Sequence, residues 1–249
     1  MWYKVKKILV RQNWVEKQVR PYRYNPNANT VLYYPLEKDW NDYSGNNHNL
    51  TWNSTPSYWV SWWTKSVVNL WGNKLWRITN LSWTFTNYTF NVWCKISWTG
   101  TWQEIFDCYN WDDSAVKNSA YFGYNSSEVS QSDFFYQRRP WGWTANYGKV
   151  YWTSNRSINT WYNVCLTSTS SWIKIFLNWT EIANWNITWA IVSESWHNSL
   201  WWRYDNSTSP AQNKNFFNWY LSEFIFESKT WTATEITNYY NQTKSNYWL

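Results

Sequence analysis

The chain has 249 residues, 44% of them hydrophobic and 15% charged, so it can bury a core and is not an intrinsically disordered protein. No apolar run is long enough to predict a membrane span, and Ile8–Val10 is too short for the core of a signal peptide. The net charge of +6 comes from residues 1–24, since the remaining 15 basic and 15 acidic residues cancel, so the main domain is not expected to bind nucleic acid.

The first predicted element is a basic hairpin within residues 1–28, with a tight turn at Asn13-Trp14. Seven basic residues and one acidic residue fall in residues 1–24. This imbalance predicts an attachment segment that contacts an acidic assembly partner; a solvated pair of strands without a partner is the alternative. Residues 29–249 are then expected to form one domain.

Short segments of alternating polar and apolar residues follow along the rest of the chain, separated by turn residues. The clearest pair is Trp161–Thr167 and Trp172–Leu177. Further strands are predicted near Ser66–Asn69, Leu75–Ile78, Tyr88–Ile96, Gln103–Cys108, Ala120–Tyr124, Asp133–Arg138, Lys149–Tyr151, Ala190–Val192, Ser199–Tyr204 and Phe216–Glu227. Many short strands predict an all-β sandwich or barrel. A helix is predicted only at Thr232–Gln242, with Thr232 or Thr234 as its N-cap.

Tryptophan stands at many positions where a tight turn needs glycine. The chain has 28 Trp and 6 Gly, whereas typical usage of about 7% would give roughly 17 glycines. Two-residue hairpin turns need positive φ, which favours Asn-Gly and disfavours a bulky residue. We hypothesise that most of these Trp residues are glycines in the natural protein, encoded by UGA; a truly Trp-rich protein is the alternative. The affected pairs are Asn13-Trp14, Asp39-Trp40, Asn178-Trp179, Asn184-Trp185 and Asn218-Trp219.

The three cysteines, Cys94, Cys108 and Cys165, have no metal-site spacing, and the chain has only two histidines. A zinc site is therefore not expected, and buried free thiols are the simplest interpretation.

Four motifs occur in a recognisable order: a strand at Thr30–Leu36 with D-x-S-G-N-x-H at Asp42–His48, a central strand at Tyr88–Lys95, a hairpin at Asn159–Trp185, and a strand and helix at Phe217–Ile236. Together they resemble the laminin G-like domain in its bacterial or phage form, within the concanavalin A-like lectin/glucanase superfamily. The resemblance implies a two-sheet antiparallel jelly-roll sandwich with one short C-terminal helix. Asp112–Arg156 has no counterpart in it.

The resemblance also implies that the first and last strands are neighbours, where some members hold a structural ion. Asp39, Asp42 and Glu223 are therefore candidate ligands for calcium, which prefers oxygen ligands. In the alternative interpretation, Asp39 and Asp42 bind backbone N–H groups and cap turns.

Sugar binding needs aromatic platforms and a few directed polar groups. In the segment without a counterpart, the candidates for a concave or rim site are Tyr124, Tyr136, Arg138 and Trp143. Glycoside hydrolysis needs two carboxylates on one face. Glu104 and Asp107 are three residues apart, which places them on opposite faces of a regular strand, so hydrolysis is not expected.

These features predict a non-catalytic recognition module, carbohydrate-binding or adhesive, whose partner is a glycan or a cell-surface protein. The expected location is extracellular, on a cell surface or on a phage virion. Two alternatives stay open: a structural domain of a surface or tail assembly without a ligand, and a degenerate glycoside hydrolase.

Overall fold

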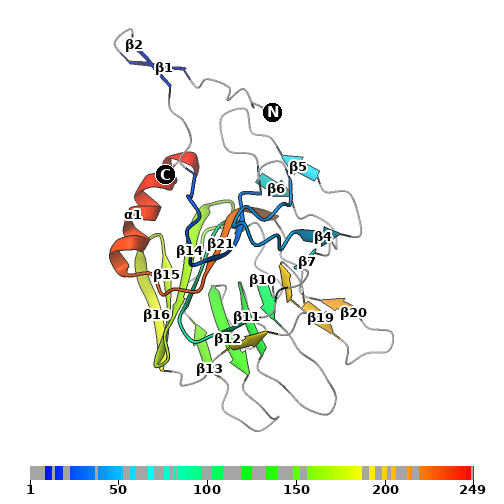
Figure 1. The fold of residues 1–249 in the computed structure, drawn as a ribbon. Helices are drawn as coiled ribbons and strands as arrows, with labels where there is room; N and C mark the ends of the chain where they lie inside the picture. Colours follow the sequence, from blue (N-terminus) through cyan, green and yellow to red (C-terminus); the bar gives the residue numbers. More distant parts are fainter. Residues whose placement is uncertain are drawn as a thin grey trace.

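The structure is a computed structural model that describes residues 9–12, 15–18, 23–36, 39–52, 57–59, 67–69, 76–78, 81, 83–96, 103–108, 119–124, 133–139, 148–151, 156–186, 191–193, 198–200, 203–205, 212–214, 219–247 and 249. Two large antiparallel sheets face each other, and helix α1 (Ala233–Thr243) lies along the outer side of one of them (Figure 1). The prediction of an all-β sandwich with one short C-terminal helix is confirmed.

The sheet beside the helix has eight strands. Its strands run in the order β16 (Thr180–Asn186), β15 (Trp172–Leu177), β14 (Trp161–Ser168), β9 (Tyr88–Ile96), β21 (Trp219–Glu227), β6 (Val67–Asn69) and β5 (Ser57–Trp59), and β3 (Thr30–Tyr34) also pairs with β21. The first strand of the domain therefore pairs with the last one, as the resemblance implied.

The facing sheet has seven strands. They run in the order β13 (Gly148–Tyr151), β12 (Phe134–Arg139), β11 (Ser119–Tyr124), β10 (Gln103–Cys108), β18 (Asn198–Leu200), β7 (Trp76–Ile78) and β4 (Leu50–Trp52). The described residues also form three two-stranded ribbons: β1 (Leu9–Gln12) with β2 (Val15–Gln18), β8 (Trp83–Phe85) with β17 (Ile191–Ser193), and β19 (Arg203–Asp205) with β20 (Gln212–Lys214).

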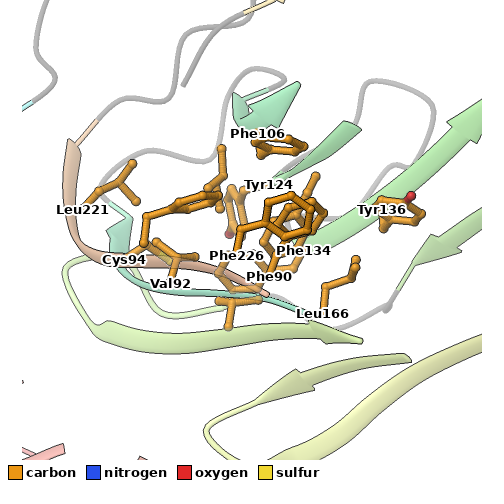
Figure 2. Close-up of a cluster of buried hydrophobic side chains, with 14 of the residues drawn as sticks. Phe90, Val92, Cys94, Phe106, Tyr124, Phe134, Tyr136, Leu166, Leu221 and Phe226 are labelled. Carbon is orange, nitrogen blue, oxygen red and sulfur yellow. The ribbon is translucent and has the colours of Figure 1, made fainter. Parts of the chain in front are cut away.

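Aromatic side chains fill the space between the two large sheets (Figure 2). The ring of Phe90 lies 4.4 Å from that of Phe226 and 4.5 Å from that of Phe106, measured between centroids. The hydroxyl groups of Tyr88 and Tyr136 are 2.8 Å apart and hydrogen-bond to each other inside this core. The alternation of apolar residues along each strand produces this core, because every second side chain faces the opposite sheet.

A second core lies between the eight-stranded sheet and α1, which continues as the short helix η1 (Lys244–Tyr247). Thr232 caps α1 in a reciprocal capping box with Glu235, so the predicted cap is confirmed. Trp93 is fully buried here, stacks on Tyr247 with centroids 4.1 Å apart, and donates from Nε1 to Thr243 Oγ1 at 3.2 Å. The sheet thus has apolar side chains on both faces.

The turn between β15 and β16 has positive φ at both central residues, as a type I′ turn requires. Asn178 has a φ of +47° and Trp179 a φ of +71°, and the Trp179 side chain is 46% exposed. Positive φ at both central positions is the conformation for which Asn-Gly is preferred. The predicted need for glycine at position 179 is therefore real, while the codon hypothesis stays a prediction.

Cys94 and Cys165 are free thiols that lie in different cores, Cys94 between the sheets and Cys165 beneath α1. Burial raises the pKa of both thiols, and the charge of Glu227 adds to the effect at Cys165. Both are therefore inert packing residues at neutral pH. In the part of the chain that the structure describes, no helix has the length and apolar character needed to cross a membrane.

Candidate functional site

Two of the four predicted sugar-binding residues belong to the core. Tyr124 and Tyr136 are fully buried between the sheets, in contact with the other aromatic rings there (Figure 2). The prediction that their rings form a concave or rim platform is wrong, because a fully buried ring cannot stack on a ligand at the surface. The backbone of Arg138 pairs with Ala120 and Gly148, and its side chain lies outside the described part of the chain, as does all of Trp143.

Asp42 organises the loop between β3 and β4. Its Oδ1 accepts hydrogen bonds from the backbone N–H groups of Tyr33 (3.0 Å) and Ser44 (2.9 Å). Its Oδ2 accepts from Ser44 Oγ (2.7 Å) and from the backbone N–H of His48 (3.1 Å). Only 8% of Asp42 is exposed, and burial together with the charge of Asp42 raises the pKa of nearby Tyr34. The carboxylate therefore acts as an internal cap that closes the D-x-S-G-N-x-H loop.

The other two predicted metal ligands are also hydrogen-bonded. Glu223 shares Tyr33 with Asp42, because its Oε1 accepts from the Tyr33 hydroxyl at 3.4 Å while Asp42 accepts from the Tyr33 backbone N–H. Asp39 accepts from the backbone N–H of Asn41 (3.2 Å) and from the Tyr43 hydroxyl (2.8 Å). Glu223 is fully buried beneath α1, where it accepts from the Tyr239 hydroxyl at 2.9 Å. Burial, with the charge of Glu223, raises the pKa of Tyr239.

Among the described residues, no three acidic, histidine or cysteine side chains form a group that could hold a metal ion. The structure therefore does not bring Asp39, Asp42 and Glu223 together as one set of ligands. The contacts of Asp39 and Asp42 match the turn-capping alternative, and calcium stays a prediction.

Strand β10 contains a bulge that changes which residues share a face. Glu104 pairs with Gly123 and Asp107 pairs with Tyr121, and the register shifts between Glu104 and Phe106. One extra residue, Ile105, lies on the bulged strand, so the alternation moves by one position. Glu104 and Asp107 therefore occupy the same face of the sheet, and the prediction that they lie on opposite faces is wrong.

The register of the seven-stranded sheet aligns polar residues in one row across every strand. Each of these residues is the direct partner of the next, and we call the set the polar row. Its members are Thr51, Arg77, Ser199, Asp107, Tyr121, Gln137 and Lys149.

The polar row lies on the face of this sheet that is turned away from the core. The residues next to it on β10, β11 and β12 are Phe106, Phe122 and Tyr136, which are fully buried between the sheets. Because successive residues of a strand alternate between faces, the row belongs to the outer face. The two sheets thus differ: α1 packs on the outer face of one, and polar positions cross the outer face of the other.

Part of that outer face is covered by the chain itself. Phe135 lies on it, two residues before Gln137, and pairs with Gly123 and Tyr151. Only 1% of Phe135 is exposed, although it does not belong to the core between the sheets. The polar row therefore runs beside a buried aromatic side chain.

Solved structures with the same fold include a domain of an arabinanase and the binding domains of two other proteins. One is domain 4 of AbnA, an extracellular GH43 arabinanase from Geobacillus stearothermophilus, in complex with arabinotriose, with a TM-score of 0.64 and 13% identity over 84% of this chain and 97% of that chain. Another is the binding domain of Paraclostridial Mosquitocidal Protein 1, with a TM-score of 0.63 and 15% identity over 86% of this chain and 52% of that chain. The chain has the β-sandwich fold of these domains.

A third structure with this fold is the binding domain of botulinum neurotoxin DC in complex with SialylT, with a TM-score of 0.57 and 12% identity over 86% of this chain. The chain spans about half the length of the two toxin domains, at 52% and 51%, but nearly all of the arabinanase domain, at 97%. No family model and no curated protein matches the sequence.

Proposed function

We propose that this protein is a non-catalytic module that recognises a glycan through the polar row. The observation that carries the proposal is the register that places seven polar residues side by side on the outer face of the seven-stranded sheet. The fold supports it, because similar folds include an arabinanase domain in complex with arabinotriose and toxin binding domains.

The composition of the row suits a sugar. Carbohydrate recognition combines a flat aromatic or apolar surface with a small number of directed polar groups. Tyr121 lies between Asp107 and Gln137, and directly paired residues have Cβ atoms roughly 4.5–5.5 Å apart. At a spacing of about 4.8 Å per strand, seven strands span roughly 29 Å. The row is therefore long enough for an oligosaccharide rather than a single sugar unit.

Tyr121→Ala and Gln137→Ala are each expected to weaken glycan binding at least about tenfold, which corresponds to about 1.4 kcal/mol. The two residues are direct partners on β11 and β12, at positions that alternate with the buried residues Phe122 and Tyr136. A glycan that binds the wild-type protein is first identified on a glycan array. The affinity of each variant for that glycan is then measured by calorimetry.

Lys174→Ala on β15 is the matched control, because Lys174 lies on the eight-stranded sheet, where it pairs with Glu181 at 2.7 Å. This control should bind as the wild type does. The absence of any glycan ligand on the array, or wild-type affinity in both row variants, would contradict the proposal and favour a structural domain without a ligand.

We extend the proposal to membership in the laminin G-like group and to a place on a cell surface or a phage virion. The pairing of β3 with β21 and the closed D-x-S-G-N-x-H loop support the first point. Immunogold labelling of the producing cells and of any particles that they release would test the second.

A second candidate function is glycoside hydrolysis, which the bulge in β10 favours. Glu104 and Asp107 pair with Gly123 and Tyr121, which are two residues apart, so the backbone positions of the two acidic residues are separated by roughly 6.8 Å. Glycosidases use two carboxyl groups that flank the bond they cleave, and two acidic residues on one face of a sheet can supply such a pair. Release of reducing sugar from a bound glycan, lost in both Glu104→Gln and Asp107→Asn, would establish this activity; binding without release would exclude it for that glycan.

A further inference from the structure

Strand β3 of the eight-stranded sheet pairs along one edge only among the strands that the structure describes. Its residues Thr30 to Tyr34 pair with Glu227 to Phe224 of β21. No other described strand pairs with β3. The backbone N–H and C=O groups on its outer edge could therefore bond a strand of another chain, which is the hazard that edge strands carry.

The D-x-S-G-N-x-H loop bonds the backbone of Tyr33 on this outer edge. Asp42 Oδ1 accepts from the Tyr33 N–H at 3.0 Å, and the Tyr43 N–H donates to the Tyr33 carbonyl at 2.8 Å. In a regular antiparallel pair, one residue exchanges both an N–H and a C=O bond with the residue opposite. The loop therefore takes the place that one residue of a further strand would have at Tyr33.

Two further side chains of the loop cover the carbonyl groups that come earlier in β3. Ser44 Oγ donates to the Val31 carbonyl at 3.0 Å. Asn46 Nδ2 donates to the carbonyls of Val31 and Thr30, at 3.0 Å in each case. The cover therefore extends along most of the outer edge of the strand.

The loop reaches β3 with side chains at alternate positions, although it is not a strand. Asp42, Ser44 and Asn46 are two residues apart, which is the period at which side chains of an extended chain face one side. Gly45 has a φ of +93° and Asn47 a φ of +59°, and positive φ interrupts an extended strand. The loop therefore bonds the edge of β3 without presenting a new strand edge of its own.

The strand that this loop covers is held to β21 by side chains as well as by backbone pairing. Glu227 on β21 is 1% exposed and accepts hydrogen bonds from the Tyr24 hydroxyl and from Asn27 Nδ2, the latter at 2.6 Å. Tyr24 and Asn27 lie just before β3 in the chain. Removal of the loop contacts would therefore expose the edge of β3 and would not release the strand from the sheet.

We propose that the outer edge of β3 is a pairing surface for a second copy of this chain, and that the D-x-S-G-N-x-H loop keeps it covered. Two copies of one strand can pair antiparallel about a two-fold axis, because each then offers the other the same groups. Tyr33 carries both the donor and the acceptor that such a pair exchanges. The loop thus prevents association through the sheet, and this inference does not depend on the proposed function.

The test compares the wild type with two variants in which the cover is removed in full or in part. The full variant combines Asp42→Ala, Ser44→Ala and Asn46→Ala. The partial variant combines Ser44→Ala and Asn46→Ala and keeps Asp42, because the loss of Asp42 destabilises the fold. Asp39→Ala is the control, since the hydrogen bonds of Asp39 are to residues outside β3.

Analytical ultracentrifugation measures the dissociation constant of the dimer, and hydrogen–deuterium exchange of residues 30–34 reports whether β3 lies in the interface. The full variant is expected to dimerise at least about tenfold more tightly than the wild type and Asp39→Ala, and the partial variant to a smaller extent. Exchange in β3 is expected to slow as the protein concentration rises, because pairing protects the Tyr33 amide.

A folded full variant that stays monomeric would overturn the inference. So would a dimer in which the exchange of residues 30–34 does not depend on concentration, since the two copies would then meet elsewhere. If circular dichroism shows that the full variant is unfolded, the partial variant decides. A folded partial variant that dimerises no more than Asp39→Ala rejects the role of the loop.

Discussion

Glycine in place of Trp93 is expected to unfold the protein, whereas glycine in place of Trp179 is expected to leave its stability unchanged or raise it by up to about 1 kcal/mol. Trp93 is fully buried beneath α1, stacks on Tyr247 and hydrogen-bonds to Thr243. Truncation of a buried Trp costs about 3–5 kcal/mol, and glycine inside a strand adds roughly 0.5–1 kcal/mol. That sum is a large part of the stability of a typical domain.

The opposite result at Trp179 follows from its backbone. A φ of +71° costs a residue with a Cβ roughly 1–2 kcal/mol, which glycine does not pay. The loss of contact with the Tyr240 ring, whose centroid is 4.4 Å away, offsets part of this gain. The two substitutions are chemically identical, so each is the control for the other.

Urea unfolding monitored by circular dichroism would measure both variants. A drop of more than about 2 kcal/mol in Trp179→Gly would show that the tryptophan belongs at this turn. The coding DNA gives an independent answer: a UGG codon at position 179 would end the codon hypothesis there, and a UGA codon in a gene that also reads UGG at position 93 would support it.

Asp42→Ala is expected to lower the free energy of unfolding by about 3–4 kcal/mol. The substitution removes the acceptor for the backbone N–H groups of Tyr33, Ser44 and His48. An unsatisfied buried donor costs roughly 1–3 kcal/mol, and not all three are equally buried. Asp42→Asn should be intermediate, because the amide keeps one acceptor oxygen. Asp39→Ala should cost less than about 1 kcal/mol, because Asp39 accepts hydrogen bonds from only two exposed groups.

The same variants separate turn capping from calcium binding. If Asp42 is only an internal cap, its oxygens are already occupied by four donors, so EDTA and calcium should leave the melting temperature of the wild type unchanged. A rise in melting temperature with calcium in the wild type that is absent in Asp42→Ala would contradict this expectation and establish an ion at the loop.

Most strands and the helix could be predicted because local patterns decide them. The alternation in Trp161–Thr167 and Trp172–Leu177 matches β14 and β15 nearly residue for residue, and Thr232 with Glu235 carries a complete capping signal. The predicted strand Ser199–Tyr204 is instead divided between β18 and β19. Trp201 and Trp202, which follow β18 in the sequence, lie outside the described residues.

The candidate site could not be predicted in the same way. The face of the sheet on which a residue lies depends on how its strand pairs with strands that are distant in the sequence. Tyr124 and Tyr136 have aromatic neighbours on both faces of their strands, so the sequence does not reveal which face meets the other sheet. The sequence does contain one sign of the bulge in β10: Ile105 and Phe106 are adjacent apolar residues, and both are fully buried. A regular strand on one side of a core would bury only one of them. Two adjacent apolar residues could therefore have indicated a bulge and placed Glu104 and Asp107 on the same face of the sheet.

The attachment of Tyr24 and Asn27 to Glu227 has a mechanical consequence. A pulling force on residues 1–24 passes along the chain into β3 and, through these hydrogen bonds, into β21, which lies inside the eight-stranded sheet between β9 on one side and β3 and β6 on the other. The contacts with Glu227 therefore load β21 and its pairing with β9 in addition to the pairing of β3 with β21. The junction between residues 1–24 and the sandwich is therefore expected to resist force better than the pairing of β3 alone would.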